Sequence, residues 1–484
     1  MELVTGITLK KLVLTENNID WSERDLIEPG QFQRVLREKA GLVLPATTKS
    51  TEPDLELGSV ALNALLTAPW MSRTWIIQEA AVASHAWFMF GGSYVSWSHM
   101  MFAIQCLRWL MTSEEARSIR GTLNLRFILP DSARSMETLG VIAEIQHAEQ
   151  RMPLWELLSR LRLTKATDPK DKIYGLCGIA SDSQSLPLPD YNKPVETVYR
   201  DYTMSLISMS GPLALSFLLP EAGLYQQSGA MDLPSWIPEW SNPVILGVDL
   251  CRKYWLEDST LKTGARDHAV ANWKFDINTS SGSLSIPGVI RHTITNLTPK
   301  IADQRPWHLP IHFEQANQPL MATAAINCED GSNDNAYETL FERLVNTITC
   351  NMYVTSPPSG PPSARFGQAG AAYRELLKEA QLRSQDEDTN GGGTLEIEDK
   401  PTYHIFRFLS GRRLCVTSSG LFGLVPECTE VGDQLVVFEH HATYFVIRPR
   451  GLEHVLVGPA FVEDVDQIWK HDTRTDPAVD ITLV

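Results

Sequence analysis

The chain has 484 residues, too many for one hydrophobic core, so two or three domains are expected. Its composition, 43% hydrophobic and 21% charged residues, is that of a soluble globular protein, and no uninterrupted apolar stretch reaches the length of a membrane span. Neither a membrane span nor a nucleic-acid partner is expected, the second because the net charge of −16 argues against a general polyanion-binding surface.

The seven cysteines are scattered and form no C-x-x-C pair, which fits neither a zinc site nor a disulfide framework. The 12 histidines do not cluster with cysteines or acids at ligand spacing. These patterns predict no metal and a reducing compartment, the cytoplasm. Residues 1–11 lack a basic region followed by a long apolar run, so no signal peptide or anchor is predicted.

The first 60 residues offer a weak strand candidate at 9–14 and a helix candidate at 31–42, and we expect them to pack as a loose arm. Residues 69–79 then read Pro-Trp-Met-Ser-Arg-Thr-Trp-Ile-Ile-Gln-Glu. Helical spacing puts Glu79 at the border of an apolar stripe that includes Trp75. A carboxylate there is either held in a structural ion pair or kept ready with a shifted pKa, and both interpretations stay open.

The segment that follows predicts a β-hairpin, because two β-prone apolar runs flank the turn at Gly91 and Gly92. Ser96 can cap a helix that continues to about Met111. Residues 136–163 are helical by periodicity, and Pro153 suits the first turn of a helix.

The segment 167–172 is an informative helix start. Asp168 can cap the helix, Pro169 fits its first position, and Asp171 can return a hydrogen bond near the positive end of the helix dipole. Capping is favoured over a ligand role for both acids.

Prolines dominate the next two irregular segments. Residues 187–194 predict an extended loop that leads into a helix over 195–209. Residues 233–240 predict a buried crossing segment, in which two prolines exclude regular structure and Trp236 and Trp240 anchor the packing.

From about residue 273 the pattern alternates like strands, near 275–278, 283–286 and 289–294. Residues 351–400 are rich in Pro, Gly, Ser and acids, which predicts a flexible insertion. Six short runs follow, and they predict a small barrel or sandwich that recruits the earlier strands; they lie at 403–409, 413–417, 421–425, 434–438, 444–448 and 455–457. Arg412 and Arg413 are expected to begin an exposed strand rather than to bind phosphate.

Five stretches in this order resemble the fungal heterokaryon-incompatibility (HET-domain) proteins: residues 69–79, 166–176, 189–201, 233–240 and 411–433. The residues that carry the resemblance as structural motifs are Trp70, Asp168, Asp171, Tyr174, Asp190, Tyr191, Trp236, Gly411, Arg413, Gly420 and Gly423. For Trp70, Tyr174 and Tyr191, packing is favoured over ligand stacking.

The resemblance implies a fungal, intracellular protein of non-self recognition, in which incompatible partners trigger growth arrest or cell death. It also implies an α/β domain distantly similar to TIR domains, some of which cleave NAD with a carboxylate. On this chain Glu79 would be that catalytic carboxylate, and Arg73, Trp75 and Gln78 would contact the substrate. The usual opening motifs, Tyr-x-Ala-Leu-Ser-Tyr-x-Trp-Gly and Ile-Asp-Ala-x-Cys-Ile-Asn-Gln, do not occur, so the resemblance implies a HET domain without its N-terminal part.

The prediction is therefore an α+β protein. It places a truncated, TIR-like remnant at residues 1–112, a helical middle at 113–265, a C-terminal β-barrel or sandwich at 266–350 and 401–470, and the disordered insertion at 351–400. The favoured function is a HET-type regulatory protein that acts through a protein partner, with no catalysis and no cofactor. The alternatives are an NAD-cleaving nucleosidase that uses Glu79 and an accessory member of a biosynthetic or stress gene neighbourhood.

Overall fold

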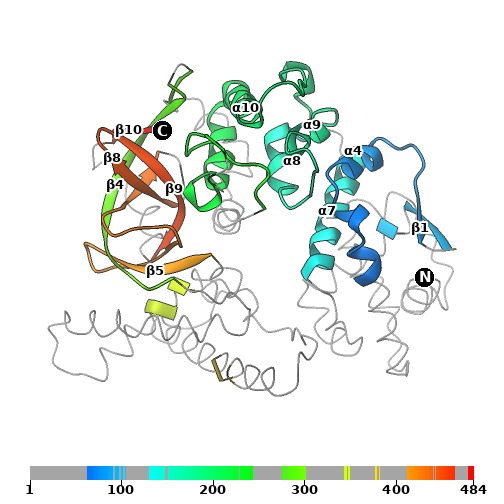
Figure 1. Cartoon of the computed structure of the whole chain (residues 1–484). Coiled ribbons are helices and arrows are strands. Elements are labelled where there is room, and N and C mark those ends of the chain that lie inside the picture. The colour runs from blue at the N-terminus through cyan, green and yellow to red at the C-terminus, as the bar shows by residue number, and fades with distance from the viewer. Residues whose placement is uncertain are drawn as a thin grey trace, which may run out of the picture. The chain divides into compact units, whose positions relative to one another are not determined.

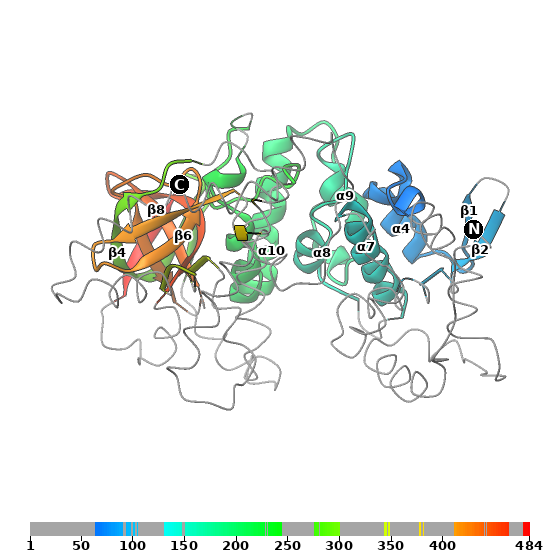
Figure 2. The same ribbon diagram turned by 90° about the horizontal axis from the view of Figure 1, so that it is seen from below.

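The computed structural model describes residues 63–104, 130–147, 151–243, 275–300, 343–348, 377–381, 411–463 and 478–484, with short gaps inside several of these ranges. The described residues fall into two compact units, the first ending at Asn192 and the second beginning at Lys193. Figures 1 and 2 show helices and a small hairpin in the first unit, and one long helix and a curved sheet in the second. The predicted α+β class is confirmed.

The first unit is built from short helices. In chain order its elements are η3 (Pro69–Ser72), α4 (Trp75–Ala81), β1 (Trp87–Phe90), β2 (Ser93–Ser96), α7 (Pro130–His147), α8 (Leu154–Arg160), α9 (Asp171–Cys177) and η5 (Ser183–Ser185). The predicted hairpin is confirmed, with β1 and β2 antiparallel. The helical pattern over 136–163 is divided between α7 and α8, because Pro153 has extended backbone angles and α8 starts after it.

Helix α4 contacts α7 and α9, and α8 contacts α9, so α4 and α9 form the middle of this packing. The α9 side chains Ile173, Tyr174 and Leu176 are buried. Gly175 allows the close approach of α4, since a Cβ at this position would lie 3.2 Å from Thr74 Cγ2.

The second unit begins with α10 (Val195–Leu218), which follows the extended Pro194 as predicted but runs beyond Met209 and is interrupted at Gly211. Two short turns, η6 (Leu219–Glu221) and η7 (Leu224–Gln226), then contact strand β9. The strands are β3 (Asp276–Asn278), β4 (Ser283–Leu297), β5 (Arg412–Thr417), β6 (Phe422–Pro426), β7 (Gln434–Phe438), β8 (Tyr444–Arg450), β9 (Glu453–Val462) and β10 (Val479–Leu483).

The sheet has the order β10-β4-β5-β6-β9-β8-β7, and further pairings join β4 to β7 and β10 to β9. The pairings therefore form a closed circuit that returns to β4. Strand β4 can serve several neighbours because its register shifts between Ile290 and His292 and again between Ile294 and Asn296. The core of this circuit is apolar and includes Ile294, Cys415, Val425, Leu435, Tyr444, Val446, Val457 and Ala460.

Five of the six predicted C-terminal strands are confirmed as β5 to β9, and the recruitment of the earlier strands is confirmed by the pairing of β4 with β5 and β7. The expected strand at 403–409 and the arm over the first 60 residues lie outside the described residues, and so do the predicted domain boundaries near 112 and 265 and nearly all of the insertion at 351–400. Across the described part of the chain, no helix combines the length and apolar character needed to cross a membrane.

Candidate functional site

Glu79, the predicted catalytic carboxylate, lies on the exposed side of α4. The buried stripe of this helix consists of Ile76, Ile77 and Ala80. Among the residues that the structure describes, the Glu79 side chain has no hydrogen-bond or ion-pair partner. The structural ion pair considered from the sequence is therefore not formed within this part of the chain.

The three predicted substrate contacts point to different surroundings. Trp75 lies against Gly175 of α9, and the Gln78 amide lies so close to Gly178 that a Cβ there would be 3.0 Å from Nε2. The Arg73 side chain is exposed, while its backbone forms an isolated parallel bridge with Lys165. Trp75 and Gln78 thus face α9, whereas Arg73 and Glu79 face solvent.

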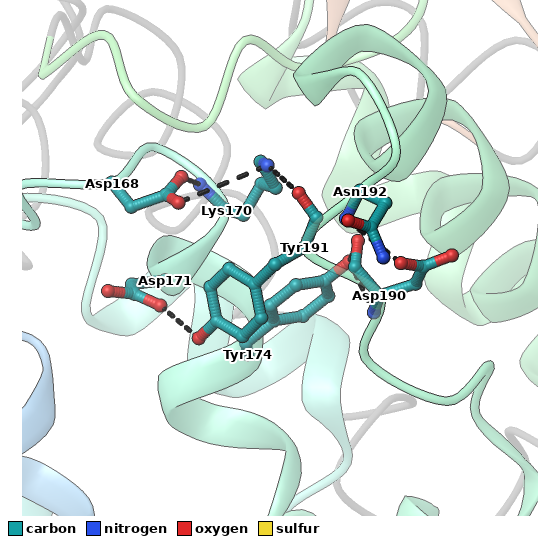
Figure 3. A network of polar contacts seen from close by, with 7 residues as sticks. All are labelled: Asp168, Lys170, Asp171, Tyr174, Asp190, Tyr191 and Asn192. Carbon is teal, nitrogen blue, oxygen red and sulfur yellow. Dashed lines mark hydrogen bonds and ion pairs between the residues drawn. The ribbon is translucent and has the colours of Figure 1, made fainter.

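The structure does bring together a different set of polar side chains, drawn in Figure 3 and called here the clasp: Asp168, Lys170, Asp171, Tyr174, Asp190, Tyr191 and Asn192. They come from α9, the turn before it and the loop at 187–194. Tyr174 lies at the centre and is buried. Its hydroxyl donates to the Asp190 carbonyl at 3.0 Å and accepts the Asp190 N–H at 3.1 Å, so one side chain holds both backbone groups of the loop residue.

Tyr191 closes the clasp from the outside. Its hydroxyl donates to Asp171 Oδ1 at 2.6 Å, and its ring meets the Tyr174 ring edge-on with centroids 5.1 Å apart. Lys170 donates from Nζ to the Tyr191 carbonyl at 2.7 Å and lies 5.7 Å from the centre of the ring. Partial burial, followed by the bond to Asp171, raises the pKa of Tyr191 to about 12.

Two aspartates fix the turns at either end of the clasp. Asp168 Oδ1 accepts the Lys170 N–H at 3.0 Å, and Asp190 Oδ1 accepts the Asn192 N–H at 2.9 Å. The predicted helix capping by Asp168 and Asp171 is wrong, because α9 begins at Asp171, its N-cap is Lys170 and no side chain caps it. Asp168 instead closes the turn before the helix, and the Asp171 carboxylate accepts the Tyr191 hydroxyl. The described bonds of the clasp join its members to one another, so its chemistry is that of a fastening between loop and helix.

Trp70 and Trp236 differ in burial. Trp70 is 39% exposed and meets the Phe88 ring edge-on, so it is less buried than the predicted core residue. Trp236 and Trp240 are confirmed as packing anchors, because both are fully buried. The Trp236 indole also donates from Nε1 to the Gly282 carbonyl at 2.9 Å.

The glycine and arginine motif of the second unit serves turns and close packing. Gly411 and Gly420 have φ of 68° and 73°, which suits glycine at tight turns. The expectation that Arg412 and Arg413 begin an exposed strand is wrong, because Arg412 is buried and Arg413 donates from Nη2 to the Thr429 carbonyl. Burial lowers the pKa of Arg413. Charge alone predicted exposure, whereas the Arg412 side chain is buried and that of Arg413, on the opposite face of β5, is half-buried.

No protein-family model and no solved structure matches the chain. A curated relative is similar over most of its length: the heterokaryon incompatibility protein 6, OR allele, of Neurospora crassa is 24% identical over 469 residues. The match covers 82% of this chain and 64% of the relative, so the chain spans less than two thirds of that protein. This distant similarity agrees with the HET-type resemblance of the motifs.

The described residues contain no group of three or more His, Cys, Asp or Glu side chains placed to hold a metal ion. The clasp was missed from the sequence, although Tyr174 and Tyr191 were each selected as packing residues. The available signal was that the motif stretches 166–176 and 189–201 each contain an Asp and a Tyr. Nothing in their spacing indicates that the Tyr174 hydroxyl bonds to the backbone of Asp190.

Proposed function

We propose that the chain is a HET-type regulatory protein of non-self recognition, which acts in the cytoplasm through a protein partner and without catalysis. The observation that carries the proposal is the similarity to a heterokaryon incompatibility protein across 82% of this chain. The order of the five motif stretches supports it independently of that alignment.

The absence of catalysis is supported by the surroundings of Glu79. A catalytic carboxylate works through a perturbed pKa and fixed neighbours in a site that excludes water. Glu79 is exposed, and Trp75 and Gln78 direct their contacts to α9. These contacts favour packing over a shared ribose or nicotinamide site.

The proposal extends to the origin of the two units. We take the described elements before residue 113 as part of a HET domain with TIR-like ancestry, and those from Pro130 to Gln226 as the helical middle region. The closed circuit of strand pairings supports a small β-barrel in the second unit. In this arrangement the clasp holds the loop before α10 in place and takes no part in a reaction.

A genetic experiment in the source fungus tests the proposal. Deletion of the gene in one of two incompatible strains should restore a viable heterokaryon, and wild-type protein should restore growth arrest. The Glu79→Gln variant should restore growth arrest as well as the wild-type protein does. Glu137→Gln, a matched control at an exposed glutamate of α7, should do the same. The purified wild-type chain should leave NAD intact over hours.

Two outcomes would overturn parts of this proposal. If deletion leaves the incompatible response unchanged and alters only metabolite or stress phenotypes, the recognition function is wrong. If Glu79→Gln abolishes both growth arrest and a measurable NAD cleavage while Glu137→Gln does not, the chain is a nucleosidase.

A further inference from the structure

The hairpin of β1 and β2 presents an apolar face to solvent. Trp87, Met89 and Tyr94 are 62%, 78% and 70% exposed. Trp87 and Met89 share one face of β1, and Tyr94 is the direct cross-strand partner of Met89. The rings of Trp87 and Tyr94 meet at 5.7 Å, so the three side chains form one continuous patch, called here the hairpin patch.

The opposite face of the hairpin is already covered. Phe88 is buried and its ring stacks on Trp97 with centroids 5.0 Å apart. Trp97 donates from Nε1 to Gln146 Oε1 at 2.6 Å, and Gln146 donates to the Ala80 carbonyl at 2.8 Å. The hairpin is therefore fastened to α4 and α7 through one face, which leaves the hairpin patch as a fixed surface.

The edge of β1 offers hydrogen-bonding groups beside this patch. The bond from the Trp97 N–H to the Ala86 carbonyl, at 3.0 Å, sets the alternation of the antiparallel ladder. The pairs Trp87–Ser96 and Met89–Tyr94 are then the ones that do not exchange backbone hydrogen bonds. The N–H and C=O groups of Trp87 and Met89 therefore point away from β2. The residues with exposed side chains thus also present, at the edge, N–H and C=O groups that β2 does not use.

Of the usual protections of such an edge, β1 has its short length of four residues but no charge and no proline. Residues 86–98 contain no charged residue and no proline. Exposed edge strands in soluble proteins normally carry lysine, proline or a bulge that prevents pairing with another chain. A short, uncharged, aromatic edge strand indicates that another strand pairs with it.

Area and charge decide between a second copy and a different protein. The exposed parts of three large side chains amount to about 400 Å², roughly half of what one partner contributes to a stable dimer. Two copies would each bring a net charge of −16 and repel one another. A single added strand needs less area, because main-chain hydrogen bonds supply part of the affinity.

We propose that the edge of β1 binds an extended segment of a partner protein as a third strand, with alternating apolar side chains on the hairpin patch. This inference rests on the proposed function, since it names the surface through which the recognition protein meets its partner.

Selection of 12-residue peptides from a random display library against the full-length chain tests this proposal. Selected peptides should alternate apolar and polar residues and contain no Pro in the centre. Trp87→Ser and Met89→Ser should each weaken the binding of a selected peptide by about tenfold or more. Leu452→Ser, at a fully exposed leucine of the second unit, should leave it unchanged.

Peptides methylated on backbone nitrogen separate strand addition from a non-directional apolar contact. In an added strand, every second residue of the peptide directs its N–H towards β1. Methylation of those nitrogens should abolish binding, and methylation of the intervening nitrogens should preserve it. Equal tolerance of both phases, absence of any alternating consensus, or indifference to Trp87→Ser and Met89→Ser would overturn the proposal. A dimer in sedimentation that Met89→Ser disrupts would assign the surface to a second copy instead. If the peptides fail while the heterokaryon response still depends on the chain, the proposed function stands and this surface is wrong.

Discussion

Replacement of Gly423 by alanine gives a test of the packing between β5, β6 and β9. Gly423 lies directly opposite Cys415 in the β5–β6 ladder. A Cβ at Gly423 would stand 2.8 Å from Cys415 Sγ and 3.2 Å from the Phe461 carbonyl oxygen. The distance to the sulfur is shorter than the contacts that Cβ atoms make in proteins. Burial raises the pKa of the Cys415 thiol to about 12, so the sulfur is an uncharged apolar neighbour at neutral pH.

The new methyl group has to displace the sulfur or the backbone of β9. Overpacking of this kind reduces the free energy of unfolding by about 1–3 kcal/mol. Cys415→Ala alone leaves a small void and costs about 1 kcal/mol. The double variant should cost less than the sum of the two by about 1 kcal/mol or more, because the methyl group added at position 423 occupies the space that the sulfur leaves.

Gly420→Ala is the matched control. Nothing lies within 4 Å of a Cβ at Gly420, but its φ of +73° is costly for alanine, by about 1 kcal/mol. Cys415→Ala should not relieve that cost. Protection of the β5 and β6 amides in hydrogen exchange, followed for the wild type, the three single variants and the two double variants, measures the effect within this sheet. Strictly additive losses for Gly423→Ala and Cys415→Ala would refute the steric reasoning.

Three further predictions concern the clasp and the crossing segment. Tyr174→Phe should reduce the free energy of unfolding by about 1–2 kcal/mol in urea, because the Asp190 N–H loses its partner, whereas Tyr191→Phe should cost about 0.5 kcal/mol at its exposed position. In spectrophotometric titration, the difference between wild type and Tyr191→Phe should show a tyrosine that ionises near pH 12, and Asp171→Asn should lower this value. Since the folded pKa lies above the ordinary 10, the stability from neutral Tyr191 is complete below pH 10 and is lost as the pH rises towards 12. Trp236→Phe should cost about 1–3 kcal/mol in thermal unfolding, because it leaves a buried carbonyl without its donor.

The hairpin and the C-terminal strands could be predicted because their signals are local. Short β-prone apolar runs mark these strands, and Gly, Pro or Asp separates most of them. Strand β4 shows where local signals end. Pro287 and Gly288 suggest a break between two short strands, yet β4 continues through them. The Cβ of any other residue at position 288 would lie about 3 Å from Ile481, Val436 and Phe438, so glycine is required there by packing.

The surroundings of Glu79 could not be predicted from helical periodicity. Helix α4 has seven residues, which is fewer than two full turns and too short for the pattern to set which face is buried. The helix buries Ile76, Ile77 and Ala80, so the expected stripe through Trp75 is rotated by about one residue. The neighbours that decide this rotation, α7 and α9, lie far along the chain.

The bonds of the clasp limit which residues could carry the proposed recognition function. The Tyr174 hydroxyl bonds to the Asp190 backbone, and the Asp171 carboxylate accepts the Tyr191 hydroxyl. A substitution at these residues therefore disturbs the fold, whichever partner is present. Discrimination between partners requires side chains whose replacement alters the surface and leaves the core intact. Trp87 and Met89 meet this requirement, because their backbone is fixed by the ladder while their side chains remain exposed. Allelic differences that change recognition are therefore expected on the hairpin patch and outside the family motifs.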